Sequence, residues 1–144
     1  MAKQRPERQK AIREIVRMQA ICRQCELMEQ LSALGFSCTQ ATISRDMVEL
    51  GIRKLRGGIY VLAEDLHLQR MVSDFVLELI QVNNMILVKA QPGTASAIAG
   101  ALDVGEFSDC LGTIAGNDTV LIVCPGNDEA THFIEMLRGL KRSN

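Results

Sequence analysis

The sequence predicts an α+β protein in two parts: a small helical domain that ends in a β-hairpin, and a four-stranded antiparallel α/β domain. Amphipathic stretches separated by turn residues fill the first part. The second part runs in the order hairpin, helix, hairpin, helix. The charge divides in the same way. Residues 1–62 carry 11 Lys and Arg against 6 Asp and Glu, whereas residues 63–144 carry 5 against 11.

This charge division bears on the kinds of partner. A basic half suits a polyanion, and an acidic half suits a cation or a partner subunit, although both could simply be solvated faces. With one Tyr, four Phe and no Trp, the chain lacks platforms for stacking single-stranded bases. No apolar run approaches the roughly 18 residues of a membrane span. No apolar stretch follows the basic N-terminus either, so we expect a cytoplasmic protein without a secretory signal or a membrane partner.

Three helices are expected in the basic half. Pro6 suits the first turn of the first helix. The second helix is expected over residues 24–34, with Gly35 as its C-terminal cap. Thr39 can N-cap the third helix, which runs to Leu50.

The third helix has an apolar side and a side suited to a DNA groove. The apolar side consists of Ile43, Met47 and Leu50. The other side consists of Ala41, Ser44, Arg45 and Val48, with Thr42 and Glu49 beside them. Small residues permit close approach, hydroxyls reach phosphates or base edges, and Arg can bind guanine bidentately. Many three-helix domains bind only protein, so that alternative stays open.

A basic hairpin follows the third helix. Residues 52–55 and 59–62 read as two short strands joined at Arg56-Gly57-Gly58. Three helices and such a wing make a winged helix-turn-helix, which we assign to residues 1–64. Lys54 and Arg56 are its candidate phosphate contacts.

Three of the five cysteines allow a rival interpretation. Cys22, Cys25 and Cys38 lie close together in the sequence and could begin a metal or redox-sensing site. Structural zinc usually takes two close ligand pairs, and here there is no second C-x-x-C. The odd, scattered cysteines fit reduced thiols. We therefore assign no metal. Cys25 fits a small apolar filler of the second helix equally well, and metal or redox sensing stays the rival regulatory hypothesis.

The acidic half begins with a linker or connecting helix over residues 65–74, and a domain over residues 75–144 follows. The expected strands cover residues 75–81, 85–90, 111–115 and 119–123. The expected helices cover residues 94–103 and the segment from Asn127 onward, on one face of the sheet. No phosphate-binding loop, nucleophile elbow or catalytic triad is evident. The sequence therefore indicates no reaction and no catalytic residue for the alternative that the protein is an enzyme.

Two features of this half bear on binding and assembly. Gly116-Asn117-Asp118 interrupts two strand-like runs. We interpret it both as a tight turn, in which Gly and Asn supply positive φ, and as a rim that presents Asp118 to a cationic ligand. The helix over residues 94–103 carries Ala95, Ile98, Ala99 and Leu102. These side chains offer more small apolar surface than a single two-layer α+β domain can cover by itself. We therefore expect part of this helix, or the sheet face opposite it, to be buried between subunits.

Three motifs in the right order resemble the bacterial arginine repressor family. They are TQATISRDMVELG (residues 39–51) followed by the wing, QPGTASAIAGALD (residues 91–103) and GTIAGNDT (residues 112–119). The resemblance covers nearly the whole chain. It implies that the winged helix binds double-stranded operator DNA and that the C-terminal domain forms trimers which pair into hexamers. It also implies that L-arginine binds between trimers as corepressor, and that the genes under control are those of arginine biosynthesis or catabolism.

The resemblance also assigns residues. The DNA-reading positions fall on Gln40, Thr42, Ser44 and Arg45. The arginine-binding positions fall on Ser96, Asp103, Thr113, Asn117 and Asp118. Asp103 and Asp118 suit a ligand with a guanidinium and an ammonium group. The family usually shows two consecutive acids after the glycine, whereas the first is Asn117 here.

Overall fold

The computed structural model describes residues 4–142 and contains two compact units, which divide between Ala63 and Glu64. Each unit has its own hydrophobic core. The predicted α+β class, with a helical N-terminal unit and a four-stranded antiparallel sheet, is confirmed. None of the helices in the described residues is both long and apolar enough to cross a membrane.

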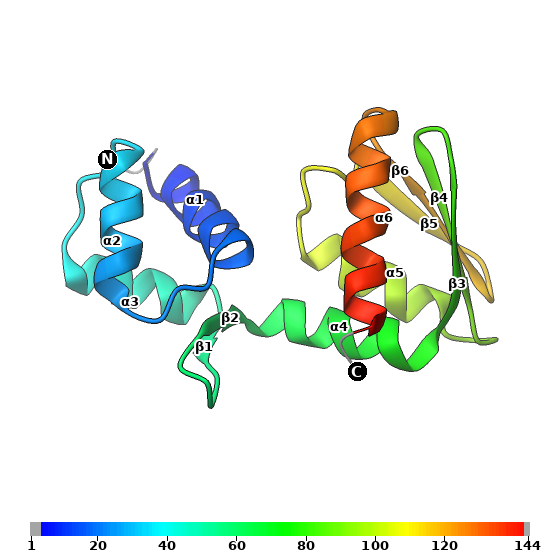
Figure 1. Ribbon diagram of the computed structural model, residues 1–144, viewed down its shortest axis with the longest axis horizontal. Coiled ribbons are helices and arrows are strands. Elements are labelled where there is room, and N and C mark those ends of the chain that lie inside the picture. The colour runs from blue at the N-terminus through cyan, green and yellow to red at the C-terminus, as the bar shows by residue number, and fades with distance from the viewer. Residues whose placement is uncertain (1–3, 143–144) are drawn as a thin grey trace. The chain divides into compact units, whose positions relative to one another are not determined.

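The N-terminal unit is a three-helix bundle with a wing (Figure 1). Its elements are α1 (Gln4–Met18), α2 (Gln24–Ala33), α3 (Gln40–Glu49), β1 (Ile52–Lys54) and β2 (Tyr60–Leu62). The two strands pair antiparallel, with Ile52 opposite Leu62. The predicted second and third helices and the two strands of the hairpin are confirmed to within one residue at each end, and Pro6 lies in the first turn of α1 as expected. The core consists of Ile12, Ile15, Val16, Ile21, Leu27, Leu31, Ile43, Met47 and Leu62.

The ends of α2 and α3 follow from their capping residues. Thr39 is the N-cap of α3, and its hydroxyl accepts a hydrogen bond from the Thr42 backbone N–H at 3.3 Å. Gly35 and Gly51, which follow α2 and α3, have φ of +91° and +70°. Residues with a Cβ rarely adopt that left-handed conformation, so glycine ends both helices.

The C-terminal unit is a sheet with helices on one face (Figure 1). Its elements are α4 (Ala63–Phe75), β3 (Val76–Val82), β4 (Met85–Ala90), α5 (Ala95–Val104), β5 (Gly112–Ala115), β6 (Thr119–Val123) and α6 (Asn127–Arg142). The strand order is β3-β4-β6-β5, and every neighbouring pair is antiparallel. The segment expected to be a linker or a connecting helix forms α4, and its Leu68 and Val72 are buried in the core of this unit.

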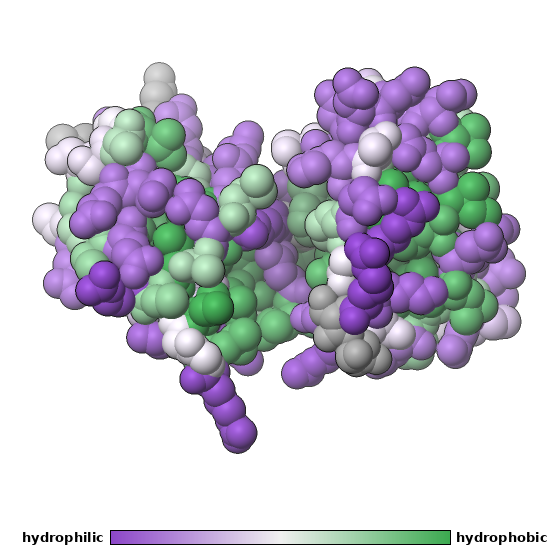
Figure 2. All heavy atoms as spheres, in the orientation of Figure 1, coloured by the Kyte–Doolittle hydropathy of each residue, from purple (hydrophilic) through white to green (hydrophobic). Residues whose placement is uncertain are grey.

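The two faces of the sheet differ in what covers them. Ile86, Val88 and Ala90 of β4 are buried under the helices. Residues that alternate with them in the register point to the opposite face. The apolar members of that opposite face are Ile80, Val82, Met85, Leu87, Ile114, Leu121 and Val123. Figure 2 shows hydrophobic side chains gathered along the side of the unit where the sheet lies.

The expectation that α5 has apolar surface to spare is wrong. Ala95, Ile98, Ala99 and Leu102 are all buried within the single chain. Their small side chains let α5 lie close to β5 and β6, so its own sheet covers it. The surplus apolar surface is on the other side of the sheet, where Ile114 is 70% exposed.

Gly105, which ends α5, provides a test of packing in this unit. It is buried against the ring of Phe107, whose centroid lies 5.3 Å from that of Phe133 on α6. A Cβ at Gly105 would overlap the Phe107 ring. We therefore expect Gly105→Ala to lower the free energy of unfolding by about 1–3 kcal/mol.

The matched control lies on the same helix. A Cβ at Gly100 would meet no neighbouring atom, so Gly100→Ala should stabilise the protein by up to about 1 kcal/mol. Denaturant unfolding of both variants, at one protein concentration, measures the two changes. Equal stabilities for the two variants would contradict this account of Gly105.

Candidate DNA interface and ligand site

The outer side of α3 presents most of the predicted DNA-reading residues. Gln40 and Arg45 are exposed, and Thr42 and Ser44 are half-buried. An open recess on this side is lined by Ser44, Arg45, Val48 and Glu49. The Arg45 side chain turns back along the helix, and its Nε donates to the Ala41 carbonyl at 3.4 Å. The predicted division between the buried and outer sides of α3 is confirmed.

A residue of α2 that sequence reasoning missed holds this surface in place. The Gln24 Oε1 atom accepts hydrogen bonds from Ser44 Oγ at 3.2 Å and from Gln40 Nε2 at 3.5 Å. Thr42 has a different local partner, since its hydroxyl lies 3.1 Å from that of Thr39. Gln40 and Ser44 are thus hydrogen-bonded to α2, and Thr42 to the N-cap of its own helix.

Asp46 of α3 is a buried carboxylate that the sequence interpretation passed over. It is 2% exposed, and it receives Arg8 of α1 in a bidentate pair. The Arg8 Nε–Asp46 Oδ2 distance is 2.5 Å and the Arg8 Nη2–Asp46 Oδ1 distance is 3.1 Å. Gln9 Nε2 donates to the same carboxylate at 3.1 Å. The pair joins α1 to α3 directly.

Both acids of α3 have their pKa lowered by residues of α1. Burial alone would raise the pKa of Asp46, but the hydrogen bonds from Arg8 and Gln9 and the charge of Arg8 outweigh burial, so the pKa falls below its usual value. Glu49 forms an ion pair with Arg5 and accepts from Gln9 at 2.8 Å. These bonds lower the Glu49 pKa. Both acids are thus ionised and paired, which limits their repulsion of a phosphate backbone.

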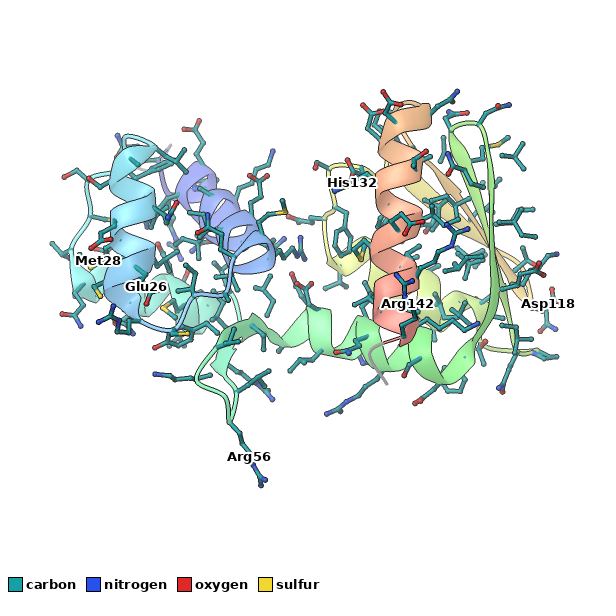
Figure 3. All side chains as sticks on the ribbon, viewed as in Figure 1. Glu26, Met28, Arg56, Asp118, His132 and Arg142 are labelled. Carbon is teal, nitrogen blue, oxygen red and sulfur yellow. The ribbon has the colours of Figure 1, made fainter. Side chains whose placement is uncertain are left out.

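The wing is basic and exposed. Lys54 and Arg56 are both exposed, and the Lys54 Nζ lies 5.3 Å from the centroid of the Tyr60 ring. Arg56 projects from the tip of the hairpin into solvent (Figure 3). The wing therefore offers exposed cations of the kind that contact phosphates rather than bases.

The predicted ligand residues of the C-terminal unit fall into two groups. At the C-terminal end of α5, Thr113 Oγ1 donates to Asp103 Oδ1 at 2.9 Å. At its N-terminal end, the Asn117 carbonyl accepts from the backbone N–H groups of Gly93 at 3.0 Å and Ala95 at 3.5 Å. Ser96 is the next residue of α5, in the first turn of the helix. Along the axis of α5, Ser96 and Asp103 are about 10 Å apart.

The turn between β5 and β6 differs from the expected geometry. None of Gly116, Asn117 and Asp118 has a positive φ, so the expectation that this turn needs Gly and Asn for its conformation is wrong. The loop spans three residues and is held by its neighbours. The Asp118 carbonyl accepts from the Ala90 N–H at 2.8 Å. These bonds tie the turn to the end of β4 and to the start of α5, and its shape follows from them.

Two residues near Asp118 escaped the sequence analysis. The Thr119 hydroxyl donates to Asp118 Oδ1 at 3.1 Å and accepts from Lys89 Nζ at 3.4 Å. Lys89 and Thr119 are partners in the register of β4 and β6. This pairing joins residues 30 positions apart, and nothing in the local sequence indicates it. Lys89 places a cation beside the acidic turn.

The cysteines do not gather into a metal site within the described residues, where no group of three potential ligands was found. Cys25 is exposed at the start of α2, and Cys22 and Cys38 are half-buried. The interpretation of Cys25 as an apolar filler is therefore wrong. The first turn of α2 carries it outward because Leu27 and Leu31 take the buried side.

Fold and surface together define a winged helix-turn-helix DNA-binding protein with a separate α+β unit. The family model described as arginine repressor, DNA binding domain, matches residues 3–68, and the model described as arginine repressor, C-terminal domain, matches residues 72–139. The chain therefore belongs to the arginine repressor family, whose members are transcriptional regulators rather than enzymes.

Similar proteins span the same length. The arginine repressor of Desulforudis audaxviator is 36% identical over 143 residues, which cover 92% of this chain and 95% of that protein. The arginine repressor of Thermus thermophilus is 41% identical over 145 residues, covering 93% and 88%. That of Solibacter usitatus is 35% identical over 136 residues, covering 92% and 94%. The family resemblance expected from three motifs is confirmed.

The Arg8–Asp46 pair can be tested through the pH dependence of stability. Asp46→Ala leaves Arg8 without its buried partner, so we expect it to lower the free energy of unfolding at pH 7 by about 2–4 kcal/mol. Because the folded pKa of Asp46 is depressed, its contribution is present above the unfolded value of about 4 and is lost as pH falls through the folded pKa.

Denaturant unfolding of the wild type and Asp46→Ala from pH 7 down to pH 3 measures this effect. The stability difference should shrink at the acid end. Asp128→Ala, which removes an exposed acid at the start of α6, is the control, and its difference from wild type should stay within about 1 kcal/mol. A difference for Asp46→Ala that does not depend on pH would show that the pair contributes only packing.

Proposed function

We propose that this chain is an arginine-responsive transcriptional regulator. It binds operator DNA as a hexamer, takes L-arginine as corepressor, and controls genes of arginine biosynthesis or catabolism in the cytoplasm. The observation that carries the proposal is the outer side of α3, which presents Arg45 and small polar residues while its two acids are held by α1. Residues 1–64 serve as the DNA-binding domain, residues 65–74 as the connection, and residues 75–144 as the oligomerisation and arginine-binding domain.

For DNA binding, α3 enters the major groove and the wing follows the backbone. Gln40, Ser44 and Arg45 lie where they can meet base edges or nearby phosphates, and Thr42 lies at the N-terminal end of the same helix. Recognition helices of this fold use such N-terminal residues for contact. Lys54 and Arg56 supply charge without sequence preference, because phosphates are common to all sequences.

For assembly, the uncovered sheet face supports burial between subunits. It holds apolar side chains on all four strands, and two of them are well exposed, Val82 at 46% and Ile114 at 70%. A contiguous apolar face is costly in water and marks a protein interface. Copies that meet through this face, as trimers paired into hexamers, would cover it with a symmetric contact.

For arginine binding, the separation of the two residue groups supports a site completed by assembly. Asp118 and Asn117 form one group with Ser96, and Asp103 forms the other with Thr113. Carboxylates in both groups suit the guanidinium and the ammonium of arginine. A ligand that binds across subunits would also stabilise the hexamer, because it favours the state in which its site is complete.

The DNA proposal predicts different effects for α3 and for the wing. Arg45→Ala should weaken operator binding by about 1–3 kcal/mol, because a bidentate contact to a base is lost. Lys54→Ala and Arg56→Ala should weaken binding to all sequences and reduce the salt slope by about one unit for each lost phosphate contact. Fluorescence anisotropy on a selected operator and on unrelated DNA, over a salt series, measures both quantities.

The control for charge is Arg70→Ala, since Arg70 is an exposed cation on α4 outside both surfaces. It should leave the ratio of operator to unrelated affinity unchanged. Operator binding by Arg45→Ala that equals the wild type at moderate salt would remove α3 from the groove and overturn the proposal.

The arginine proposal predicts opposite effects at two adjacent residues. Asn117→Asp should tighten arginine binding by roughly 1–2 kcal/mol, because a charge-assisted bond replaces a neutral one. Asp118→Ala should nearly abolish binding. Titration calorimetry, paired with the molecular mass from light scattering, measures affinity and assembly together. Unchanged affinity in both variants would mean that residues 116–118 serve only as a turn.

A further inference from the structure

Val48 is an apolar side chain in an unusual place. It lies on the outer side of α3 and is 81% exposed, the largest exposed fraction among the large apolar residues described. It is not needed for helix formation, since β-branched residues are weaker helix formers than Ala, Lys or Arg. Nor does it belong to the core of the unit, which Ile43 and Met47 of the same helix enter.

The neighbours of Val48 are the proposed DNA-reading residues. It follows Ser44 by four positions and Arg45 by three, so these side chains are adjacent on the helix surface. The same residues line the open recess of α3 together with Glu49. Glu49 is turned to Arg5 and Gln9 of α1. The apolar side chain therefore stands beside a cation, and the acid next to it is already paired.

The major groove offers one apolar group with which such a side chain can make contact. The C5-methyl group of thymine projects there, while the other base edges present hydrogen-bond donors and acceptors. A valine beside a polar base edge would desolvate that edge without giving a hydrogen bond in return. A valine beside a thymine methyl buries apolar surface on both sides.

The dimensions of the helix place this contact relative to Arg45. Three residues of an α-helix advance about 4.5 Å along its axis, and successive base pairs are separated by about 3.4 Å. We propose that Val48 is a specificity-determining residue, which packs against the methyl group of a thymine one or two base pairs from the base that Arg45 contacts. This inference rests on the proposed function and assigns to α3 an apolar readout beside its polar one.

Deoxyuridine tests the contact directly, because it lacks only the C5-methyl group of thymine and keeps the same base pairing. The thymines of one operator half-site are replaced one at a time, and the full-length wild type and Val48→Ala are titrated on each DNA. Val48→Ala retains a good helix former, so the fold is preserved. Leu34→Ala, at the C-cap of α2, removes a 60% exposed apolar side chain outside α3 and is the matched control.

We expect the effects of the deoxyuridine replacement and of Val48→Ala on affinity to be non-additive. Wild type should lose about fourfold in affinity at one thymine, the value for one buried methyl group. Val48→Ala should bind the unmodified operator at least fourfold more weakly and show no further loss at that position. Leu34→Ala should behave like the wild type on every DNA.

Two other results would overturn the inference, and they differ in what they imply. If Val48→Ala and the wild type lose the same factor at every deoxyuridine, Val48 contacts no thymine methyl. With Arg45→Ala still weakening the operator complex, the proposed function then stands and only the role of Val48 fails. If Arg45→Ala also binds as tightly as the wild type, α3 does not read the groove and both proposals fail.

Discussion

A carboxylate removed from water needs a cation, and in the N-terminal unit Arg8 meets that need for Asp46. The ion pair joins α1 to α3 and fixes which side of α3 faces α1. With Asp46 turned toward α1 and Ile43 and Met47 in the core, the opposite side of α3 is left to Ser44, Arg45 and Val48. The Asp46–Arg8 pair, together with the core residues of α3, therefore sets which side chains of α3 form the proposed DNA surface.

A second constraint acts in the C-terminal unit, where all the packed helices cover one face of the sheet. The strands then alternate between a buried side and an uncovered side that is still apolar. Such a face suits assembly better than isolation. The same geometry holds the ligand candidates at the two ends of α5, and the proposed link between arginine binding and assembly follows from that separation.

Local patterns gave most of the elements. Helical spacing, caps such as Thr39 and Gly35, and strand-like runs located the helices and strands to within a few residues. Patterns failed where burial depends on remote segments. The apolar residues of α5 looked like an interface because the sequence cannot show that β5 and β6 cover them. The expected positive φ angles at Gly116 and Asn117 were also wrong. The turn is held instead by hydrogen bonds from the Gly93 and Ala95 N–H groups to the Asn117 carbonyl.

By itself, the sequence determined the fold class, the order of the elements, the basic and acidic halves and the family, because these depend on local periodicity, on composition and on motifs read in order. Only the tertiary structure decided which groups meet. It pairs Arg8 with Asp46, brings Gln24 within hydrogen-bond distance of Ser44, and places Lys89 opposite Thr119 in the register of β4 and β6. Each of these contacts joins segments that are remote in the chain, and packing and strand register fix them where local propensity cannot.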